Sequence, residues 1–382
     1  MRIATFNLES LDLPPKARVP LEIRAEILRP ALERLQADIL CLQEVNGQHV
    51  PGESDRRLVA LDRLLAGTRY ANYARVVSTA GEGRGPADVH NLVTLSRFPI
   101  SNQREVRHGF VPPLSYPMRT AMPREVGPKP VTFDRPILVA HIEVPGGDTV
   151  VVVNAHFRAP LATAIPSQKL EPFVWKTVGG WAEGYFLSAM RRASQALELR
   201  FLLEELFDQN ASALITVAGD FNAEDYEIPL NLLVGAEENT GNPRLANRSL
   251  IVLDRALAAD RRWSLLYHGR RQMLDHMLAS QVLGLLGRRR LKRHPKEHQL
   301  EYDPVQPSVD LFWERTRRAV ARTVVFKATA ARTSAFNAFS LTLSPSRISM
   351  ARLVLPSRLA LKRPEGSSSA APLANVIFTT FL

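Results

Sequence analysis

The feature that most constrains this chain is an apolar run of strand length that ends abruptly in a carboxylate. Residues 38–44 read Asp-Ile-Leu-Cys-Leu-Gln-Glu. A carboxylate at the tip of a buried strand is costly to desolvate unless it is paired or bound to a metal. The pattern therefore predicts that Glu44 belongs to a functional site. The alternative is an ordinary solvated strand terminus.

Three other expected strands also end in polar groups. They are Phe6-Asn7-Leu8-Glu9, Asn154-Ala155-His156 and Gly219-Asp220-Phe221-Asn222. Cleavage of a phosphodiester needs a divalent cation, an activated water and a donor to the phosphoryl or leaving oxygen. Carboxylate and amide oxygens suit magnesium or manganese. The four strand ends together offer these groups, although each one alone is also compatible with a strand cap, a turn, a loop charge or a structural histidine.

Residues 1–280 alternate between strand and amphipathic helix patterns, which indicates an α/β class with layered packing. Further strands are expected at 1–8, 91–96, 137–144, 149–154 and 213–218. Helices are expected at 21–36, 58–65 and 189–206. The proline-rich residues 107–130 read as irregular surface, and 81–86 as a glycine-rich loop.

The ordered set of strand ends resembles the endonuclease/exonuclease/phosphatase superfamily, which includes pancreatic-type deoxyribonucleases, over about residues 1–280. The blocks that carry the resemblance are Ala4–Glu9, Asp38–Glu44, Asn91–Arg97, Val151–His156, Val217–Asn222 and Leu274–Ser280. The resemblance implies a four-layered α/β/β/α sandwich of two packed mixed β-sheets flanked by helices. It also implies hydrolysis of phosphodiester or phosphomonoester bonds with Mg²⁺ or Mn²⁺.

For the metal, the resemblance implies that Glu44 is the principal ligand. Asn7 and Glu9 would complete or support the site. Asp275 would support the metal or its waters, although a structural contact between Asp275 and His276 is an alternative.

For the chemistry, the resemblance implies that Asp220 orients and deprotonates the attacking water. Asn222 would donate to a phosphate oxygen, and His156 would hydrogen-bond the scissile phosphate or assist the leaving oxygen. Arg97 and the pair Arg191-Arg192 are candidate phosphate contacts, but we expect them to lie on a solvated face.

Members of the family close the site with a final Ser-Asp-His motif, which this sequence lacks. Residues 281–382 are a basic, poorly patterned segment with 17 Lys and Arg against 6 Asp and Glu, and they account for the whole net charge of +11. The segment is either an altered gene end or a divergent basic extension. We expect weakened activity unless His268, His294 or His298 replaces the missing histidine.

The resulting prediction is a metal-dependent hydrolase of a phosphate ester, with nucleic acid, a nucleotide or a phospholipid headgroup as substrate. The alternative is a catalytically impaired relative that binds nucleic acid or another polyanion through residues 281–382. The lone Cys41 and the lack of a long apolar stretch predict a cytoplasmic protein without a transmembrane segment. The oligomeric state is not predicted.

Overall fold

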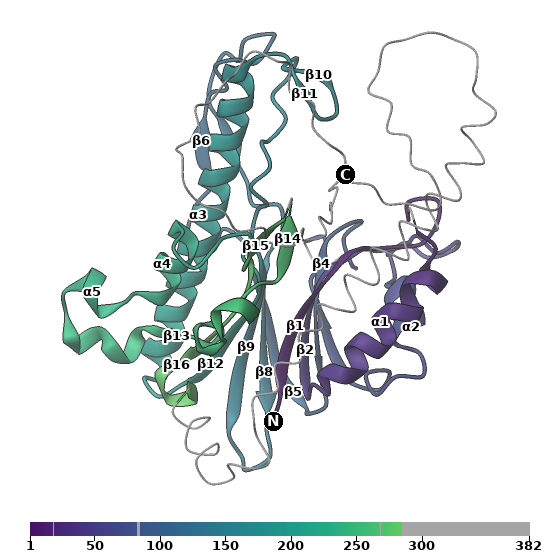
Figure 1. Ribbon diagram of the computed structural model, residues 1–382, viewed down its shortest axis with the longest axis vertical. Coiled ribbons are helices and arrows are strands. Elements are labelled where there is room, and N and C mark those ends of the chain that lie inside the picture. The colour runs from purple at the N-terminus through teal and green to yellow at the C-terminus, as the bar shows by residue number, and fades with distance from the viewer. Residues whose placement is uncertain (18, 82–84, 268, 285–382) are drawn as a thin grey trace, which may run out of the picture.

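The computed structural model describes residues 1–17, 19–81, 85–267 and 269–284. Two β-sheets pack face to face in this part of the chain, and helices cover their outer faces (Figure 1). The four-layered α/β/β/α sandwich is thereby confirmed. Within these ranges, no helix combines the length and the apolar character needed to cross a bilayer. The predicted basic segment 281–382 lies outside the described residues, apart from its first four.

The first sheet has the strand order β1-β2-β4-β3. Its strands are β1 (Ile3–Leu11), β2 (Ile39–Val45), β3 (Ala74–Val77) and β4 (Asn91–Ser96). Strands β1 and β2 are parallel, because the helix α1 (Leu21–Leu35) carries the chain back between them, whereas β4 is antiparallel to β2. The ends of β1 and β2 therefore lie at the same edge of the sheet.

The second sheet has the order β13-β16-β12-β9-β8-β5. Its strands are β5 (Ile100–Val106), β8 (Ile137–Glu143), β9 (Thr149–His156), β12 (Leu214–Asp220), β13 (Leu250–Val252) and β16 (Asp275–Ser280). The strands expected at 137–144 and 149–154 are the antiparallel pair β8–β9. Strand β12 runs parallel to β9 and antiparallel to β16, so β9 and β12 end where β16 begins.

Alternating side chains divide the core into three layers. In β2, Leu40 and Leu42 pack toward the outer helices of the first sheet, whereas Ile39 and Cys41 pack between the two sheets. The valines of β9 alternate in the same way between the space between the sheets and the outer helix α3 (Val178–Gln209). These strands are apolar throughout because both of their faces are covered.

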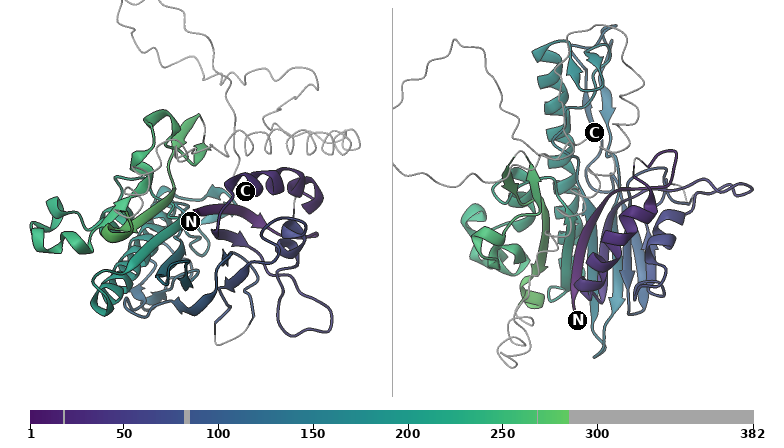
Figure 2. Two further views of the ribbon diagram at one scale, coloured as in Figure 1. Left: turned by 90° about the horizontal axis from the view of Figure 1, so that it is seen from below. Right: turned by 45° about the vertical axis from the view of Figure 1, so that its right-hand side comes forward.

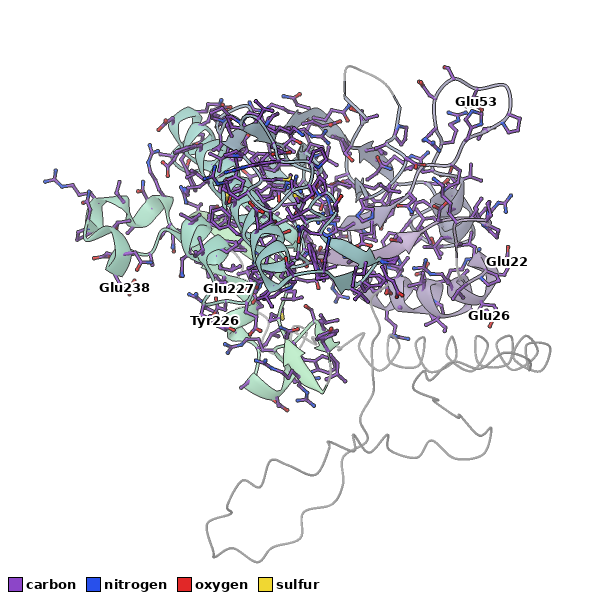
Figure 3. All side chains as sticks on the ribbon, turned by 90° about the horizontal axis from the view of Figure 1, so that it is seen from above. Glu22, Glu26, Glu53, Tyr226, Glu227 and Glu238 are labelled. Atoms are coloured by element: carbon purple, nitrogen blue, oxygen red, sulfur yellow. The ribbon has the colours of Figure 1, made fainter. Side chains whose placement is uncertain are left out.

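The helices outside the sheets expose charge to solvent. Helices α1 and α2 (Val59–Leu65) cover the first sheet, and α3 and α4 (Ile228–Val234) cover the second. Glu22 and Glu26 lie on the outer face of α1, and Glu227 and Glu238 lie at the opposite side of the molecule (Figure 3).

The short elements are β6 (Leu114–Tyr116), β7 (Lys129–Val131), β10 (Lys169–Glu171), β11 (Val174–Trp175), α5 (Glu237–Thr240), β14 (Leu265–Tyr267), β15 (Arg270–Gln272) and 3-10 turns at Pro243–Arg248, Leu253–Ala256 and Ala259–Arg261.

Helix α3 begins eleven residues before the helix predicted at 189–206, and its first half projects beyond the sheets (Figures 1 and 2). The segments 107–135 and 157–177 surround this half, and together they form what we call the arm. Residues 107–130, expected to be irregular, contain the short hairpin β6–β7. Glu183 fastens the hairpin segment to α3 by accepting hydrogen bonds from the backbone N–H groups of Arg119 (2.5 Å) and Thr120 (2.8 Å).

Two glycines allow the arm segments to approach α3 closely. A Cβ at Gly184 would lie 2.3 Å from the carbonyl oxygen of Thr163, and a Cβ at Gly180 would lie 2.6 Å from the side chain of Gln168. A Cβ at Gly179, one residue before Gly180, would meet nothing nearer than a methyl group at 3.8 Å. The glycines at 180 and 184 therefore allow close packing. They also lower the helix propensity of this segment, so the sequence pattern does not predict a helix there.

The replacement Gly184→Ala is expected to lower the free energy of unfolding by about 1–3 kcal/mol, because backbone atoms must move to admit the methyl group. Gly179→Ala is the matched control, and it should be neutral or slightly stabilising. Thermal unfolding followed by circular dichroism measures both. Equal melting temperatures for the two variants would contradict the packing that we describe.

Candidate functional site

The predicted strand ends meet at one edge of the two packed sheets. In the second sheet, the register places Asp220 of β12 directly opposite His156 of β9 on one side and Asp275 of β16 on the other. In the first sheet, Asn7 of β1 lies next to Gln43 of β2, one residue before Glu44. The structure thus brings the polar ends of five strands together.

A buried amide of the second sheet connects the two sheets just below this edge. Asn154 of β9 donates from Nδ2 to the carbonyl oxygens of Leu42 (3.2 Å) and Val93 (3.1 Å) in the first sheet. Its Oδ1 accepts from Nε2 of Gln43 at 2.8 Å. Asn154 and Gln43 are fully buried. Since Glu44 follows Gln43 and His156 lies two residues after Asn154, this bridge fixes the spacing of the site.

Asn7 joins the carboxylates of both sheets. Its Nδ2 donates to Glu44 Oε1 at 3.2 Å and to Asp220 Oδ2 at 3.0 Å, while its Oδ1 accepts from the N–H of Glu9 at 2.8 Å. His156 faces the same two acids, with Nε2 at 3.5 Å from Asp220 Oδ2 and 3.8 Å from Glu44 Oε1. In this orientation Asn7 supports the acids, and rotation of its amide would turn Oδ1 toward them.

The backbone around Glu44 adopts uncommon conformations. Glu44 has φ +57°, and Glu9 and Ser10 at the end of β1 have φ of +46° and +50°. The N–H of Ser10 donates to Glu44 Oε2 at 2.9 Å. Burial raises the pKa of Glu9 to about 8, opposed by Arg24 and reinforced by Glu44. Positive φ angles at these three non-glycine residues strain the backbone. Such strain persists only where the surrounding structure maintains it, and it is frequent at functional sites.

The Gly219–Asn222 turn holds Asp220 close to β9. Gly219 has φ +150°, and a Cβ there would lie 1.8 Å from the carbonyl oxygen of Ala155, so a side chain does not fit. The N–H of Asn222 donates to Asp220 Oδ1 at 2.8 Å, and Asn222 Nδ2 donates to the carbonyl oxygen of Phe157 at 3.1 Å. One N–H of this amide therefore binds the backbone, and the second remains for another acceptor.

Two buried carboxyl groups of the site, those of Asp220 and Asp275, have raised pKa values. Burial, together with the charges of Asp275 and Glu44, raises the pKa of Asp220 well above its usual range. Burial also raises the pKa of Asp275 to about 6. The Oδ1 atom of Asp275 is buried and has no hydrogen-bond partner among the described residues. A divalent cation coordinated by carboxylate oxygens would relieve both the repulsion and the unsatisfied oxygen, so these residues fit such an ion.

Two residues at the site gave no signal in the sequence. His90, which precedes β4, stacks its ring parallel to that of His156, with centroids 6.3 Å apart. Potential ligand atoms of Glu44, His90 and His156 lie within 4.8 Å of one another. Arg135 donates to Nδ1 of His156, which places the proton of a neutral imidazole on Nε2, facing the acids. Burial, Arg135 and His90 hold the pKa of His156 well below its usual range.

A second buried histidine lies behind the site. His276 of β16 contacts Asp254 Oδ2 through Nδ1 at 2.9 Å and the carbonyl oxygen of Ala223 through Nε2 at 2.8 Å. Both ring nitrogens face acceptors, as in an imidazolium. A structural contact between Asp275 and His276 was the alternative to a metal-supporting role for Asp275, and the acid that contacts His276 is Asp254. The bond from His276 to Ala223 ties the segment after Asn222 to β16.

The candidate phosphate contacts among the arginines differ in burial. Arg97 is exposed and pairs with Asp38 at 3.1 Å, as expected for a solvated face. The same expectation is wrong for the other pair, because Arg192 is 6% exposed and Arg191 half-buried. Both residues lie in the middle of α3 and pack against the segment that follows β9, a tertiary contact that helical periodicity does not show.

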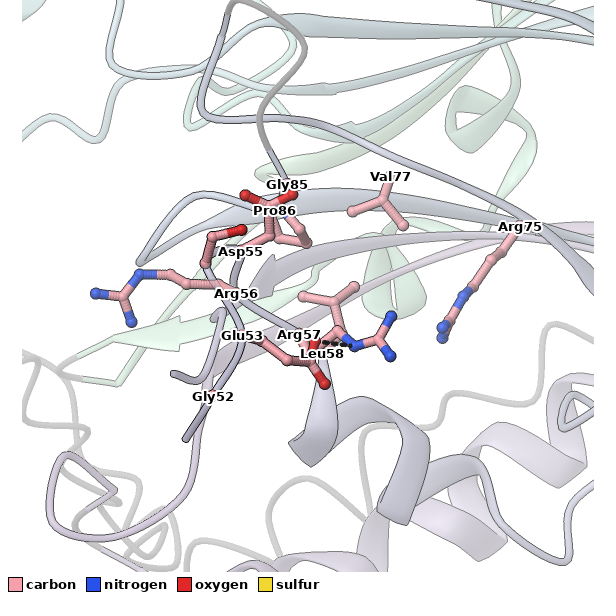
Figure 4. Close-up of a pocket in the computed structure, with 11 residues that line it drawn as sticks. Gly52, Glu53, Asp55, Arg56, Arg57, Leu58, Arg75, Val77, Gly85 and Pro86 are labelled. Atoms are coloured by element: carbon pink, nitrogen blue, oxygen red, sulfur yellow. Dashed lines mark ion pairs between the residues drawn. The ribbon is translucent and has the colours of Figure 1, made fainter. Parts of the chain in front are cut away.

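A separate pocket of about 480 Å³ lies on the flank of the first sheet (Figure 4). The loop 52–58, Arg75, Val77, Gly85 and Pro86 line it. Its charges are already paired in part, since Glu53 and Arg57 form an ion pair at 2.8 Å. None of the predicted site residues lines this pocket, so it is not part of the strand-end site.

Comparison with known protein families gives a match to most of this chain. The model of the Endonuclease/Exonuclease/phosphatase family matches residues 4–295. The chain belongs to the endonuclease/exonuclease/phosphatase family. The family match thus confirms the resemblance seen in the strand-end motifs. A search of curated protein sequences gives no match.

Solved structures of family members are similar to this chain. An endonuclease/exonuclease/phosphatase from Beutenbergia cavernae is 19% identical, with a TM-score of 0.41, over 72% of this chain and 63% of that one. TDP2 from Caenorhabditis elegans, as a truncated form, is 16% identical (TM-score 0.37; 68% and 75%). A mannosyl-6-phosphatase from Bacteroides thetaiotaomicron is 13% identical (TM-score 0.44; 73% and 85%). The chain thus spans less than two thirds of the Beutenbergia protein.

Replacement of Asn154 by leucine is expected to lower the free energy of unfolding by about 1–3 kcal/mol, because Gln43 and two carbonyl groups lose buried partners. Chemical denaturation measures the loss. Thr216→Val removes another buried hydrogen bond, to Leu278 O at 3.1 Å, within the second sheet alone, and is the matched control. If the site depends on the bridge, Asn154→Leu should also weaken its metal binding, and the control should not.

The pair of Asp254 and His276 predicts a pH dependence of stability. Burial alone would lower the pKa of His276, but Asp254 outweighs it and raises the pKa above its usual value. The stabilisation is therefore fully present below about pH 6.5 and is lost as the pH rises through the raised folded-state pKa.

Replacement Asp254→Asn should cost about 3–5 kcal/mol at pH 6, because it leaves a buried imidazolium without its counter-charge. It should cost less at pH 9. Denaturant titrations at the two pH values measure the difference, and a cost that does not change with pH would contradict the pairing.

Proposed function

We propose that this chain is a divalent-metal-dependent hydrolase of phosphodiester or phosphomonoester bonds, with Mg²⁺ or Mn²⁺ as the ion. The observation that carries the proposal is the charge arrangement of the site. Three acids from both sheets, Glu44, Asp220 and Asp275, crowd together, and Asp275 has a buried oxygen without a hydrogen-bond partner in the described part of the chain. Arg135 and His156 lie on the other side and offer N–H donors. Such a site suits a cation next to an anionic ester.

In this proposal, Glu44 is the main ligand of the ion. Asn7 and Asp275 support the ion, directly or through its waters, and Glu9 supports it through its N–H bond to Asn7. When bound, the ion would neutralise charge that develops on the phosphoryl oxygens. Its positive charge would also favour ionisation of the neighbouring carboxylates.

The remaining roles follow from the directions of the hydrogen bonds. Asp220 is held by the N–H of Asn222 and by Asn7, so its oxygens are positioned to orient a water and accept its proton. His156 presents its Nε2–H toward the same space, where it would donate to a phosphoryl or leaving oxygen. The second N–H of the Asn222 amide would donate to another phosphate oxygen.

Turnover is expected to be weak, because the sequence lacks the closing Ser-Asp-His motif. Loss of a positioned acid–base group typically removes a factor of about 10²–10⁴. His268, His294 and His298, the candidates for replacing the missing histidine, all lie outside the described residues. The alternative function, polyanion binding through residues 281–382, falls there too and stays a prediction.

Hydrolysis of bis(4-nitrophenyl) phosphate with Mn²⁺ or Mg²⁺ tests the proposal. Asp220→Asn should reduce the rate at least about 100-fold, because the variant loses the proton acceptor, and chelation of the metal should abolish the rate. Asp62→Asn, at an exposed residue paired with Arg75, is the matched control and should leave the rate unchanged. Hydrolysis that survives both chelation and Asp220→Asn would overturn the proposal.

A further inference from the structure

Four arginines lie together beside His156, and the proposed hydrolysis does not use three of them. The cluster consists of Arg135, Arg158, Arg191 and Arg192. We propose that this arginine cluster is a second anion site, so that the substrate carries a second phosphate group next to the ester that is cleaved. The inference rests on the proposed function for the position of the scissile phosphate. Its own evidence is the geometry of the cluster.

The cluster is continuous with the site. Arg135 donates to His156 Nδ1, and Arg158 follows His156 by two residues at the end of β9. Arg158 Nη1 lies 3.1 Å from Asp134 Oδ2, and Arg191 Nη1 lies 3.8 Å from Asp134 Oδ1. Asp134 thus bridges the end of β9 to α3.

The cluster holds more positive charge and more donors than its neighbours satisfy. Among the described residues, its ion pairs all go to a single carboxylate, Asp134. The Nε atoms of Arg158 and Arg191 are buried and have no hydrogen-bond partner in the same part of the chain. Unpaired buried donors of charged groups are costly, so these two arginines keep donor capacity that their protein neighbours do not use.

Burial distinguishes this cluster from ordinary surface arginines. Arg135 is 8% exposed and Arg192 is 6% exposed. Burial lowers the pKa of Arg135, and likewise that of Arg191. Arg192 donates to the carbonyl oxygen of Arg158 at 3.3 Å, which orders the cluster from behind. A guanidinium that is already desolvated and held in place loses less entropy and less hydration when it binds an anion.

The chemistry of the cluster favours phosphate. The planar fork of a guanidinium group matches two phosphate oxygens, and such bidentate pairs are strong. The acids on the other side of His156 repel anions unless a cation is bound. A substrate with two phosphates can therefore place one between the acids and His156 and the other on the arginines. A substrate with one phosphate leaves the cluster unsatisfied.

A structural role for the cluster is the competing explanation, since Arg191 also donates to Thr163 Oγ1 at 3.3 Å and Arg192 contacts the backbone of Arg158. The two explanations differ in what they predict. A structural role affects folding stability. A second anion site also affects the preference for a doubly phosphorylated ligand over a singly phosphorylated one.

The test is calorimetric titration of the full chain with inorganic pyrophosphate and with orthophosphate, with Mg²⁺ in both cell and syringe so that a cation offsets the charge of the acids. Pyrophosphate should bind at least about tenfold more tightly, as expected for one additional charge-assisted contact. Arg158→Gln and Arg191→Gln should each reduce this preference severalfold, and Arg191→Lys should restore part of it. Arg104→Gln, at an exposed arginine paired with Glu205, is the matched control and should leave the preference unchanged.

Equal affinity of the unmodified chain for the two anions would overturn the inference, and so would a preference that survives both glutamine variants. If a variant fails to fold, the comparison on the unmodified chain still decides. The titration needs no turnover. A chain that prefers pyrophosphate but hydrolyses no ester therefore refutes the proposed function alone, and a chain that hydrolyses esters without the preference refutes this inference alone.

Discussion

The geometry of the site depends on one buried amide bridge between the two sheets. Asn154 reaches from β9 to the backbone of β2 and β4 and to the side chain of Gln43. Apolar contacts between sheets do not fix how one sheet slides over the other, whereas these three directional hydrogen bonds permit a single register. Glu44 and His156 lie one and two residues beyond this bridge. Their separation is therefore set by the core and not by loops.

The bridge also explains how the structure tolerates so much buried charge. Carboxylates from separate strands repel one another and would move apart if loops carried them. Here Glu44 and Asp220 extend from inner strands of the two sheets, each paired on both sides within its own sheet, and Asn7 donates to both. The strain at Glu44 and Asn222, both with positive φ, is maintained by the same packing. The sheets thus hold in place an arrangement of charges that is unfavourable without a ligand.

The site residues at the ends of strands could be predicted from the sequence. The site residues that only a contact between distant segments brings into place could not. The end of a buried strand can be recognised locally, so Asn7, Glu44, His156, Asp220 and Asp275 were found and do lie together. His90 and Arg135 have no local pattern, because only tertiary packing brings them to His156. The partner of His276 was missed for the same reason, since Asp254 lies 22 residues away.

The start of α3 was also mispredicted, because Gly180 and Gly184 weaken the helix pattern while they permit close packing. Arg191 and Arg192, in the middle of this helix, were expected on a solvated face and instead pack against the segment that follows β9. Helical periodicity measures local preference, and here tertiary contacts outweigh it.

Helix α3 has a further consequence for how such a protein can change. One half of the helix packs on the second sheet and the other half carries the arm, and the arginines lie where the two halves join. The acids belong to the sheets, and the arm contributes none of them. Mutations in the arm, apart from those at Arg135, can therefore alter which molecules are accepted while the carboxylates of the proposed hydrolytic centre stay intact. If the proposed function holds, selectivity and reactivity are separable traits in this architecture, and each can evolve at its own rate.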